Sequence, residues 1–369
     1  MKEFPFPEKE CKAIYRYICE NFKSPDGGTY NNRGHKYIGL FGHLKLMEAE
    51  IFLYQATKDK EYLDNFKKGL SFCKRQFKEN IGIEDWWSTD YIQSSGWIES
   101  NHLGILALLI YQYYLGTGDI SFNELAEKLM LVIPKNEDNS GTFLDGFNLE
   151  KSLLDDNRYL ADHSEILVGF WALYNLTNKE IYKDYYEGIF KFFDNNFKTI
   201  PSQPDIPAWL VGPRHITYGE GTDATYCDES HTIYSQYFIS RDIMLAKSKE
   251  RYRQIVTSTE WIGHYARFED GLTGYNGMDD KMIGWSALYD AQAYWSYLIT
   301  KEERFYRNVK QTVDTILSYT SKTPIEVFIP ISRRINWQEM EENKSGLGEI
   351  WQLASILEGL SIPMTIYLV

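Results

Sequence analysis

The chain has 369 residues, of which 43% are hydrophobic and 16% aromatic, which is enough apolar material for the core of one large domain. Its formal net charge is -13, from 39 lysines and arginines against 52 aspartates and glutamates. This excess of acid disfavours nucleic acid or an anionic membrane as a partner, because no basic stripe is available to displace counterions from phosphate. The sequence therefore predicts no nucleic-acid and no membrane partner.

The N-terminal residues 1–10 lack the basic and then apolar pattern of a signal peptide. No run approaches the roughly 18 apolar residues of a membrane-spanning helix. The four cysteines have no Cys-x-x-Cys spacing, which favours reduced thiols over disulfides or a structural zinc site. These features predict a cytoplasmic protein.

A nine-residue phrase recurs five times, at intervals of 60, 60, 63 and 60 residues. Each copy has a tyrosine, then Ser or Thr three positions later, then a residue that is acidic in four copies, then an apolar or aromatic residue. The copies begin at Tyr54, Tyr114, Tyr174, Tyr237 and Tyr297. A hydroxyl and a carboxylate at this spacing suit the start of a helix, where they satisfy exposed amides and the positive helix end. A regular repeat of this length predicts an array of helical hairpins.

The helices predicted from the sequence fall into two kinds. Helices that are apolar on nearly all sides precede the phrases at about 37–56, 100–116, 162–176, 229–239 and 285–299, with a sixth at about 346–360. Helices with one polar face are predicted at about 8–23, 60–78, 121–133, 180–197, 243–264 and 302–318. Because a helix that is apolar all round must be buried, the first kind is expected inside and the second outside.

Six inner and six outer helices predict an all-α fold, an (α/α)6 toroid, in a single domain spanning residues 1–369. The N-terminal helix at about 8–23 completes the count by pairing with the last inner helix. The connections that lead into the inner helices are the long ones, from about 12 to about 30 residues. They are therefore expected on one face of the ring, and long loops in a compact domain usually carry function.

Aromatic and acidic side chains gather in these long connections and in the first turns of the inner helices. Sugars are held by such surfaces, since their C–H faces stack on rings while their hydroxyls bond to acids and amides. The predicted substrate-binding residues are Trp86, Trp87, Trp97, His102, Trp209, Tyr218, Tyr226 and Trp285. We expect a small sugar or an oligosaccharide as the substrate. No cofactor or metal is predicted, because the chain has no metal-ligand spacing and no phosphate-binding glycine loop.

This arrangement of hairpins resembles the six-hairpin glycosidase-like superfamily of (α/α)6 proteins over essentially the whole chain. The resemblance implies a carbohydrate-active enzyme. The superfamily includes glycoside hydrolases, polysaccharide lyases and sugar 2-epimerases, so the fold leaves the reaction open.

Short motifs in the sequence resemble those of three different enzyme families. The adjacent Asp155 and Asp156 are similar to the aspartate pair of toroid endo-mannanases, although they lie about six residues farther from the next phrase than that pattern expects. Asp162-His163 looks like the Asp-His that opens the same helix in the N-acylglucosamine 2-epimerase family. Asn101, followed by a histidine, is similar to the Asn-His of toroid polysaccharide lyases.

The epimerase resemblance implies proton transfer by His163 and by His231, which stands where the family has a second histidine. This chain departs from that pattern, because no histidine follows His264 and Tyr234 stands where the family usually has a glutamate. The lyase resemblance is opposed by the acidity of the chain, since such lyases bind polyanions in a basic cleft.

We therefore favour a glycoside hydrolase, in which one protonated carboxyl donates to the leaving oxygen and one carboxylate activates water, roughly 6.5–9.5 Å apart for inversion. The predicted pair is Asp156 or Asp162 with Asp223 or Asp228. Helix capping alone is the alternative explanation for an aspartate at a helix start. The other functions that the sequence leaves open are a cofactor-free 2-epimerase or isomerase, a polysaccharide lyase, and a non-catalytic toroid that binds a glycan or a protein.

Overall fold

A computed structural model describes residues 2–31, 37–88, 94–136, 140–148, 150–155, 160–196, 229–265, 267–273, 283–320 and 349–364. Two compact units are present. The first unit comprises Met1–Gly69, Trp86–Ile92 and Ile243–Val369, and the second unit comprises Leu70–Asp85 and Gln93–Asp242. Organisation as a single domain stays a prediction. Within the described ranges, no helix is both long and apolar enough to cross a bilayer.

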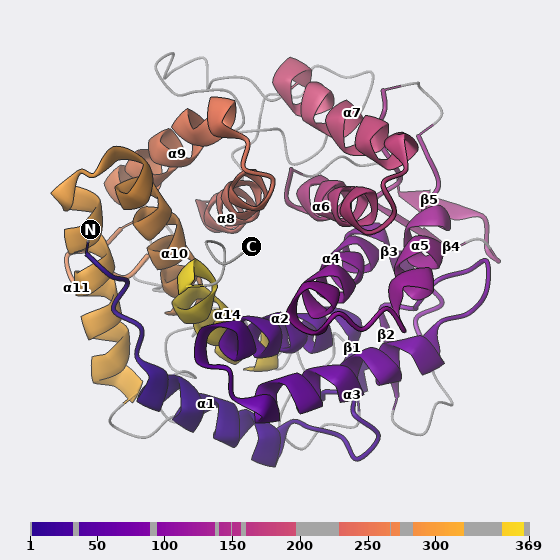
Figure 1. The fold of residues 1–369 in the computed structure, drawn as a ribbon, viewed down its shortest axis with the longest axis horizontal. Coiled ribbons are helices and arrows are strands. Elements are labelled where there is room, and N and C mark those ends of the chain that lie inside the picture. The colour runs from indigo at the N-terminus through magenta and orange to yellow at the C-terminus, as the bar shows by residue number, and fades with distance from the viewer. Residues whose placement is uncertain are drawn as a thin grey trace. The chain divides into compact units, whose positions relative to one another are not determined.

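The first unit joins the two ends of the chain. Its helices are α1 (Glu8–Asn21), α2 (Leu40–Thr57), the first part of α3 (Lys60–Gln76), α9 (Tyr252–Tyr265), α10 (Ile283–Thr300), α11 (Glu303–Thr320) and α14 (Glu349–Ser361), with short 3-10 turns η1 (Lys249–Arg251) and η3 (Ile362–Met364). Helix α14 packs against both α2 and α10, and α1 packs beside α14 (Figure 1). The expectation that the first and last helices are neighbours is thereby confirmed.

The second unit contains α4 (Ser100–Thr117), α5 (Asn123–Leu131), α6 (Leu160–Thr177), α7 (Glu180–Asn196) and most of α8 (Glu229–Leu245). Helices α4 and α6 pack directly on each other (Figure 1). Glycines permit this close approach, because a Cβ atom at Gly104 would lie 2.1 Å from the Glu165 carbonyl oxygen, and one at Gly169 would lie 2.7 Å from the Gly104 Cα.

Burial separates the two kinds of helix as the sequence predicts. Every residue of α2 from Leu40 to Leu53 is buried, as is every residue of α4 from Ser100 to Tyr113. Each is followed by an amphipathic helix, α3 or α5, that turns a polar face outward. The helices that precede the phrases therefore form the cores of both units.

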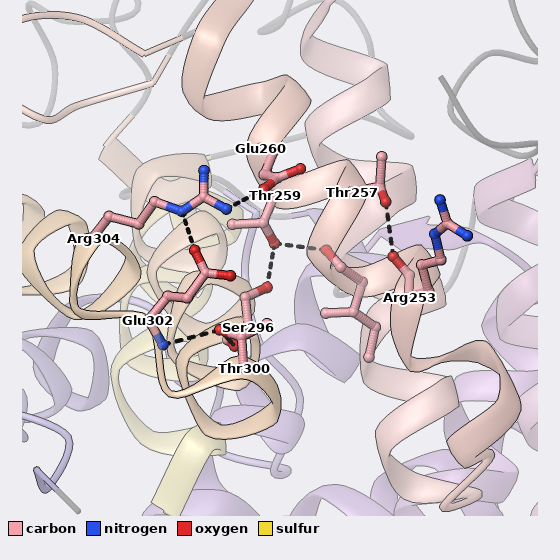
Figure 2. Close-up of polar contacts among 9 residues, drawn as sticks. Arg253, Thr257, Thr259, Glu260, Ser296, Thr300, Glu302 and Arg304 are labelled. Carbon is pink, nitrogen blue, oxygen red and sulfur yellow. Dashed lines mark hydrogen bonds and ion pairs between the residues drawn. The ribbon is translucent and has the colours of Figure 1, made fainter. Parts of the chain in front are cut away.

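Four of the five phrases form one turn geometry. In each, the threonine hydroxyl donates to the carbonyl four residues earlier and accepts the amide hydrogen two residues later, and a left-handed residue lies between. At the α10–α11 turn, Thr300 bonds to the Ser296 carbonyl at 2.9 Å and accepts from the Glu302 amide at 3.1 Å, as Figure 2 shows. Lys301 has a φ of 63°. The Ser296 hydroxyl also donates to the Thr259 hydroxyl at 2.8 Å, which links α10 to α9 beside this turn.

The fourth phrase is an exception to the predicted hairpin. Helix α8 runs through it to Leu245, rather than ending near 239, and the left-handed residue is Lys247 with a φ of 52°. The position that is left-handed in the other turns is occupied by Arg241, whose side chain is fully buried and whose Nε lies 3.1 Å from Asp242 Oδ1. This acid is therefore paired inside the helix and cannot cap the next one. The following helix α9 begins only at Tyr252.

Two small antiparallel sheets, which the sequence did not predict, lie before the inner helices. In the first unit, β1 (Tyr37–Gly39) pairs with β2 (Trp86–Ser88) and leads directly into α2. In the second unit, β3 (Ile98–Glu99), β4 (Gly146–Asn148) and β5 (Leu153–Asp155) form a sheet in that order. The register places Glu99 opposite Gly146 and Gly146 opposite Asp155. Because β3 leads directly into α4, this sheet fixes the side chains at the start of that helix.

Candidate active site of the second unit

Glu99 is the centre of a group of acidic side chains in the second unit. It ends strand β3 and stands at the N-cap position of α4, yet its side chain makes no capping bond. Its Oε1 instead accepts a hydrogen bond of 2.7 Å from the indole nitrogen of Trp97. The Trp97 ring packs on Gly146 of β4, where an added Cβ would lie 2.4 Å from a ring carbon. Both Trp97 and Glu99 remain partly exposed.

The environment of Glu99 favours its protonated form. Burial raises its pKa to about 7, the charges of Asp85 and Asp162 act in the same direction, and the charge of His102 and the Trp97 hydrogen bond oppose them. Glu99 can therefore both hold and release a proton at neutral pH, as a general acid or base must.

Asp162 supplies a second carboxyl group from the neighbouring helix. It lies in the first turn of α6, is partly exposed, and accepts a hydrogen bond of 2.9 Å from the side-chain amide of Asn101. Asn101 lies in the first turn of α4, two residues from Glu99. The close packing of α4 and α6 thus brings Asp162 near enough for its charge to raise the pKa of Glu99.

His102 and Asp85 form a buried pair beside Glu99. The Nδ1 atom of His102 lies 3.2 Å from Asp85 Oδ1. Burial by itself lowers the pKa of His102, but the hydrogen bond and charge of Asp85, with the charges of Glu99 and Asp162, raise it above the usual value. The neighbouring carboxyl groups thus favour the protonated, positively charged form of His102.

His163 is fully buried at the start of α6. Its Nε2 lies 3.0 Å from the Phe143 carbonyl oxygen, and its Nδ1 lies 4.0 Å from Asp145 Oδ1. Because a carbonyl oxygen only accepts hydrogen bonds, Nε2 carries a hydrogen. Burial raises the pKa of Asp145 well above its usual range, and the charges of Asp162, Glu99 and Asp155 raise it further. Both effects favour the protonated form of Asp145.

The other described residues from the predicted site belong to the first unit. Trp86 and Trp87 are on β2 of the first unit, where Trp86 meets Tyr37 edge to face at 5.8 Å and Trp87 is buried. Trp285, in the first turn of α10, is also buried and meets Trp351 edge to face at 5.7 Å. Sugar binding by these three tryptophans stays a prediction.

Several predicted site residues fall outside the described part of the chain. These are Asp156, Asp223, Asp228, Trp209, Tyr218 and Tyr226. His231 lies within α8, but its side chain is not among those described. The predicted pairing of a third-loop aspartate with a fourth-loop aspartate therefore stays a prediction.

Sequence reasoning missed Glu99, Asp85 and Asp145. The available signal was the Trp97-x-Glu99 pair immediately before the Asn101-His102 motif, which places an aromatic residue and an acid at the entrance of an inner helix. Within the described ranges, no group of three or more His, Cys, Asp or Glu side chains is arranged to hold a metal ion.

Replacement of Gly146 by alanine should displace the Trp97 ring, because the added methyl group would overlap it. The indole would then lose its bond to Glu99. If Glu99 takes part in a reaction, a displacement of about 1 Å at this position should lower turnover by about 10²-fold. Turnover and melting temperature of Gly146→Ala should be compared with those of Gly188→Ala, since nothing lies closer than 3.5 Å to a Cβ atom there. Equal turnover in both variants would show that Trp97 need not be held in this position.

Searches with protein-family models and among curated proteins found no match for this chain. Solved structures do match. A cellobiose 2-epimerase from Spirochaeta thermophila has a TM-score of 0.70 at 12% identity, covering 98% of this chain and 97% of its own. A sugar epimerase from a ruminal bacterium has a TM-score of 0.69 at 16% identity, covering 85% and 87%.

A third match is an inactive variant of the α-1,6-mannanase of Salegentibacter sp. HEL1_6, altered at two adjacent aspartates and bound to α-1,6-mannotriose. Its TM-score is 0.63 at 11% identity, with 98% of this chain and 99% of that chain covered. At such low identities the likeness establishes the fold and no further property. The chain has the all-α (α/α)6 toroid fold.

Proposed function

We propose that the protein is a carbohydrate-active enzyme, and specifically a glycoside hydrolase whose general acid is Glu99 and whose carboxylate partner is Asp162. The observation that carries this proposal is the contrast between the two groups. Burial gives Glu99 a pKa of about 7, whereas Asp162 is partly exposed and accepts an amide hydrogen bond from Asn101. Two carboxyl groups in unlike environments are what hydrolysis of a glycosidic bond requires.

In the proposed reaction, the protonated Glu99 donates its hydrogen to the glycosidic oxygen as the bond to the anomeric carbon breaks. The Asp162 carboxylate takes a proton from a water molecule that attacks that carbon. The Trp97 indole donates to Glu99 and so holds its carboxyl group in one orientation. The partly exposed ring offers a face on which a sugar can stack.

The choice of substrate rests on the adjacent aspartates. The matched mannanase is inactive when two adjacent aspartates are replaced. This chain has Asp155 and Asp156 next to each other, and Asp155 ends β5 opposite Gly146. An α-linked manno-oligosaccharide is therefore the first substrate to test.

The acidity of this site weighs against a polysaccharide lyase. Asp85, Glu99, Asp145, Asp155 and Asp162 belong to one group of interacting carboxyl groups. His102 is the cation that acts on Glu99 within it. A uronate would meet net repulsion there. The raised pKa values of Glu99 and Asp145 also weigh against a non-catalytic toroid, because perturbed acids cluster at catalytic sites.

A sugar 2-epimerase is the second candidate, because the two epimerases reported above have TM-scores of 0.69 and 0.70. Its chemistry needs a base that removes a proton from carbon. Full burial and the bond to Phe143 favour an orienting role for His163. Proton transfer by His163 and His231 stays a prediction, and Glu99 could serve an epimerase as the base.

The deciding experiment is incubation of the purified protein with α-1,6-manno-oligosaccharides, other oligosaccharides and free sugars. Hydrolysis releases new reducing ends, whereas epimerisation converts one free sugar or reducing end into another without releasing any. We expect new reducing ends that disappear in Asp162→Asn. Conversion without release would replace the hydrolase by an epimerase, and no change in any substrate would refute both.

A further inference from the structure

The buried pair of Asp85 and His102 has no part in the reaction proposed above. Asp85 is 4% exposed and His102 6%, so neither group is positioned to meet solvent or a large substrate. His102 lies one helical turn after Glu99 on α4, and Asp85 comes from the segment before β2, with its Oδ1 3.2 Å from His102 Nδ1. Because desolvation of a buried charge pair is costly, the pair is weak evidence of a gain in stability, and another role is worth seeking.

The groups around Glu99 show what that role can be. The charges of Asp85, from the loop before β2, and of Asp162, from α6, raise the pKa of Glu99. The charge of His102 lowers it. Asp145, from the segment before β4, is itself influenced by Glu99 and Asp162. Of these groups, only His102 can carry a positive charge. Two negative neighbours and burial oppose ionisation of Glu99, whereas the charge of His102 and the Trp97 hydrogen bond favour it.

We propose that Asp85 and His102 are positioning residues that keep a positive charge beside the Glu99 carboxyl group and thereby set the pH range over which Glu99 exchanges its proton. Asp85 holds the imidazole in place and stabilises its protonated form. The protonated imidazole then stabilises the Glu99 carboxylate that remains after proton donation. The consequence for catalysis rests on the proposed function of Glu99, whereas the effect on its ionisation does not.

The indole of Trp97 provides a direct probe, because its N–H donates to Glu99 Oε1 and its chemical shift must follow the charge of that carboxyl group. Protein labelled with [15N]tryptophan would be titrated by NMR, with the Trp97 signal assigned from its loss in Trp97→Phe. In the unaltered protein this signal should move with a midpoint near pH 7. In His102→Gln the midpoint should rise by about one pH unit, since loss of a neighbouring opposite charge makes the carboxyl group hold its proton more tightly.

The matched control is His264→Gln, which removes an exposed histidine from α9 of the first unit and should leave the midpoint unchanged. The remaining tryptophan signals report whether each variant is folded. If His102→Gln does not fold, Asp85→Asn serves instead, and the His102 ring should then titrate at lower pH than in the unaltered protein. An unmoved Trp97 midpoint in folded His102→Gln, or an unmoved His102 titration in Asp85→Asn, would overturn the proposal.

Activity measurements separate this inference from the proposed function. If Glu99 is the general acid, kcat/KM falls above pH 7 in the unaltered protein, and in His102→Gln this fall moves to higher pH together with the NMR midpoint. A moved midpoint with an unmoved pH profile would support the positioning role of His102 and remove Glu99 from the reaction. An unmoved midpoint would refute the positioning role whatever the activity.

Discussion

Replacement of Lys45 by methionine should lower the free energy of unfolding by about 3–5 kcal/mol, the usual cost of breaking a buried ion pair from one side. Lys45 lies on α2 with no exposed surface. Its ammonium group is 2.7 Å from Glu48 Oε2 on the same helix and also pairs with Glu358 on α14. Both glutamates are fully buried as well.

The physical reason is the charge that the substitution leaves behind. Methionine fills nearly the same volume, so packing between α2 and α14 is largely kept, but two buried carboxylates lose the ammonium group that pairs with both. Unfolding in urea measures the loss of stability.

Lys310→Met is the matched control in the same unit. Lys310 pairs with Asp314 at 2.8 Å on the outer face of α11, where both side chains are largely exposed. Exposed pairs contribute little to stability, so this variant should unfold almost as the unaltered protein does. If Lys45→Met and Lys310→Met lose the same free energy of unfolding, the buried ion pairs of Lys45 with Glu48 and Glu358 stabilise the first unit no more than an exposed pair does.

The hairpins were predictable because each depends on interactions within a few residues. In each turn a threonine hydroxyl donates to the carbonyl four residues earlier and accepts from the amide two residues later, so the same local sequence recurs. The four threonines are Thr57, Thr117, Thr177 and Thr300. The inner helices were predictable for the same reason, since a helix that is apolar on nearly all sides is buried on all sides.

The fourth phrase shows the limit of such reasoning. Its Ser240, Asp242 spacing matches the others, but Arg241 is buried and pairs with Asp242, so α8 continues. Whether a charged residue is buried depends on what packs against it, and that is set by distant parts of the chain. The strands β1 to β5 were missed for a related reason, because at two or three residues each they carry no hydrophobic period.

The candidate site was predictable in its residue types and in part of its location, and its function stays a proposal. Asp162, Trp97 and His102 were identified because they lie at the entrances of inner helices. Glu99 was missed because its distinguishing property is its pKa, which depends on burial and on charges from Asp85 and Asp162. Those two residues approach it only through the folded sheet and the contact of α4 with α6. Sequence spacing could not supply that environment.

Glu99→Gln should lower turnover by roughly 10²- to 10⁴-fold, the range expected when a general acid is removed. Glutamine has the same shape, and its amide oxygen can still accept the Trp97 hydrogen bond, so the melting temperature should change little. An amide cannot donate a proton to the glycosidic oxygen at any pH. The fall in kcat/KM above pH 7 that the ionisation of Glu99 produces should therefore vanish in the residual activity.

Glu124→Gln is the matched control, because Glu124 is an exposed glutamate on α5 of the same unit and pairs with Lys128 on the solvent face. It should keep the turnover and the pH profile of the unaltered protein. Substrates with a good leaving group need little help from an acid, so the defect of Glu99→Gln should be much smaller on an aryl glycoside than on an oligosaccharide. If both substrates lose turnover equally, Glu99 is not the proton donor, and a structural role for the Trp97–Glu99 bond explains the loss better. If turnover of Glu99→Gln on the oligosaccharide stays within a few-fold of normal, the general acid is another member of this group of carboxyl groups, and Asp145 is the first to test.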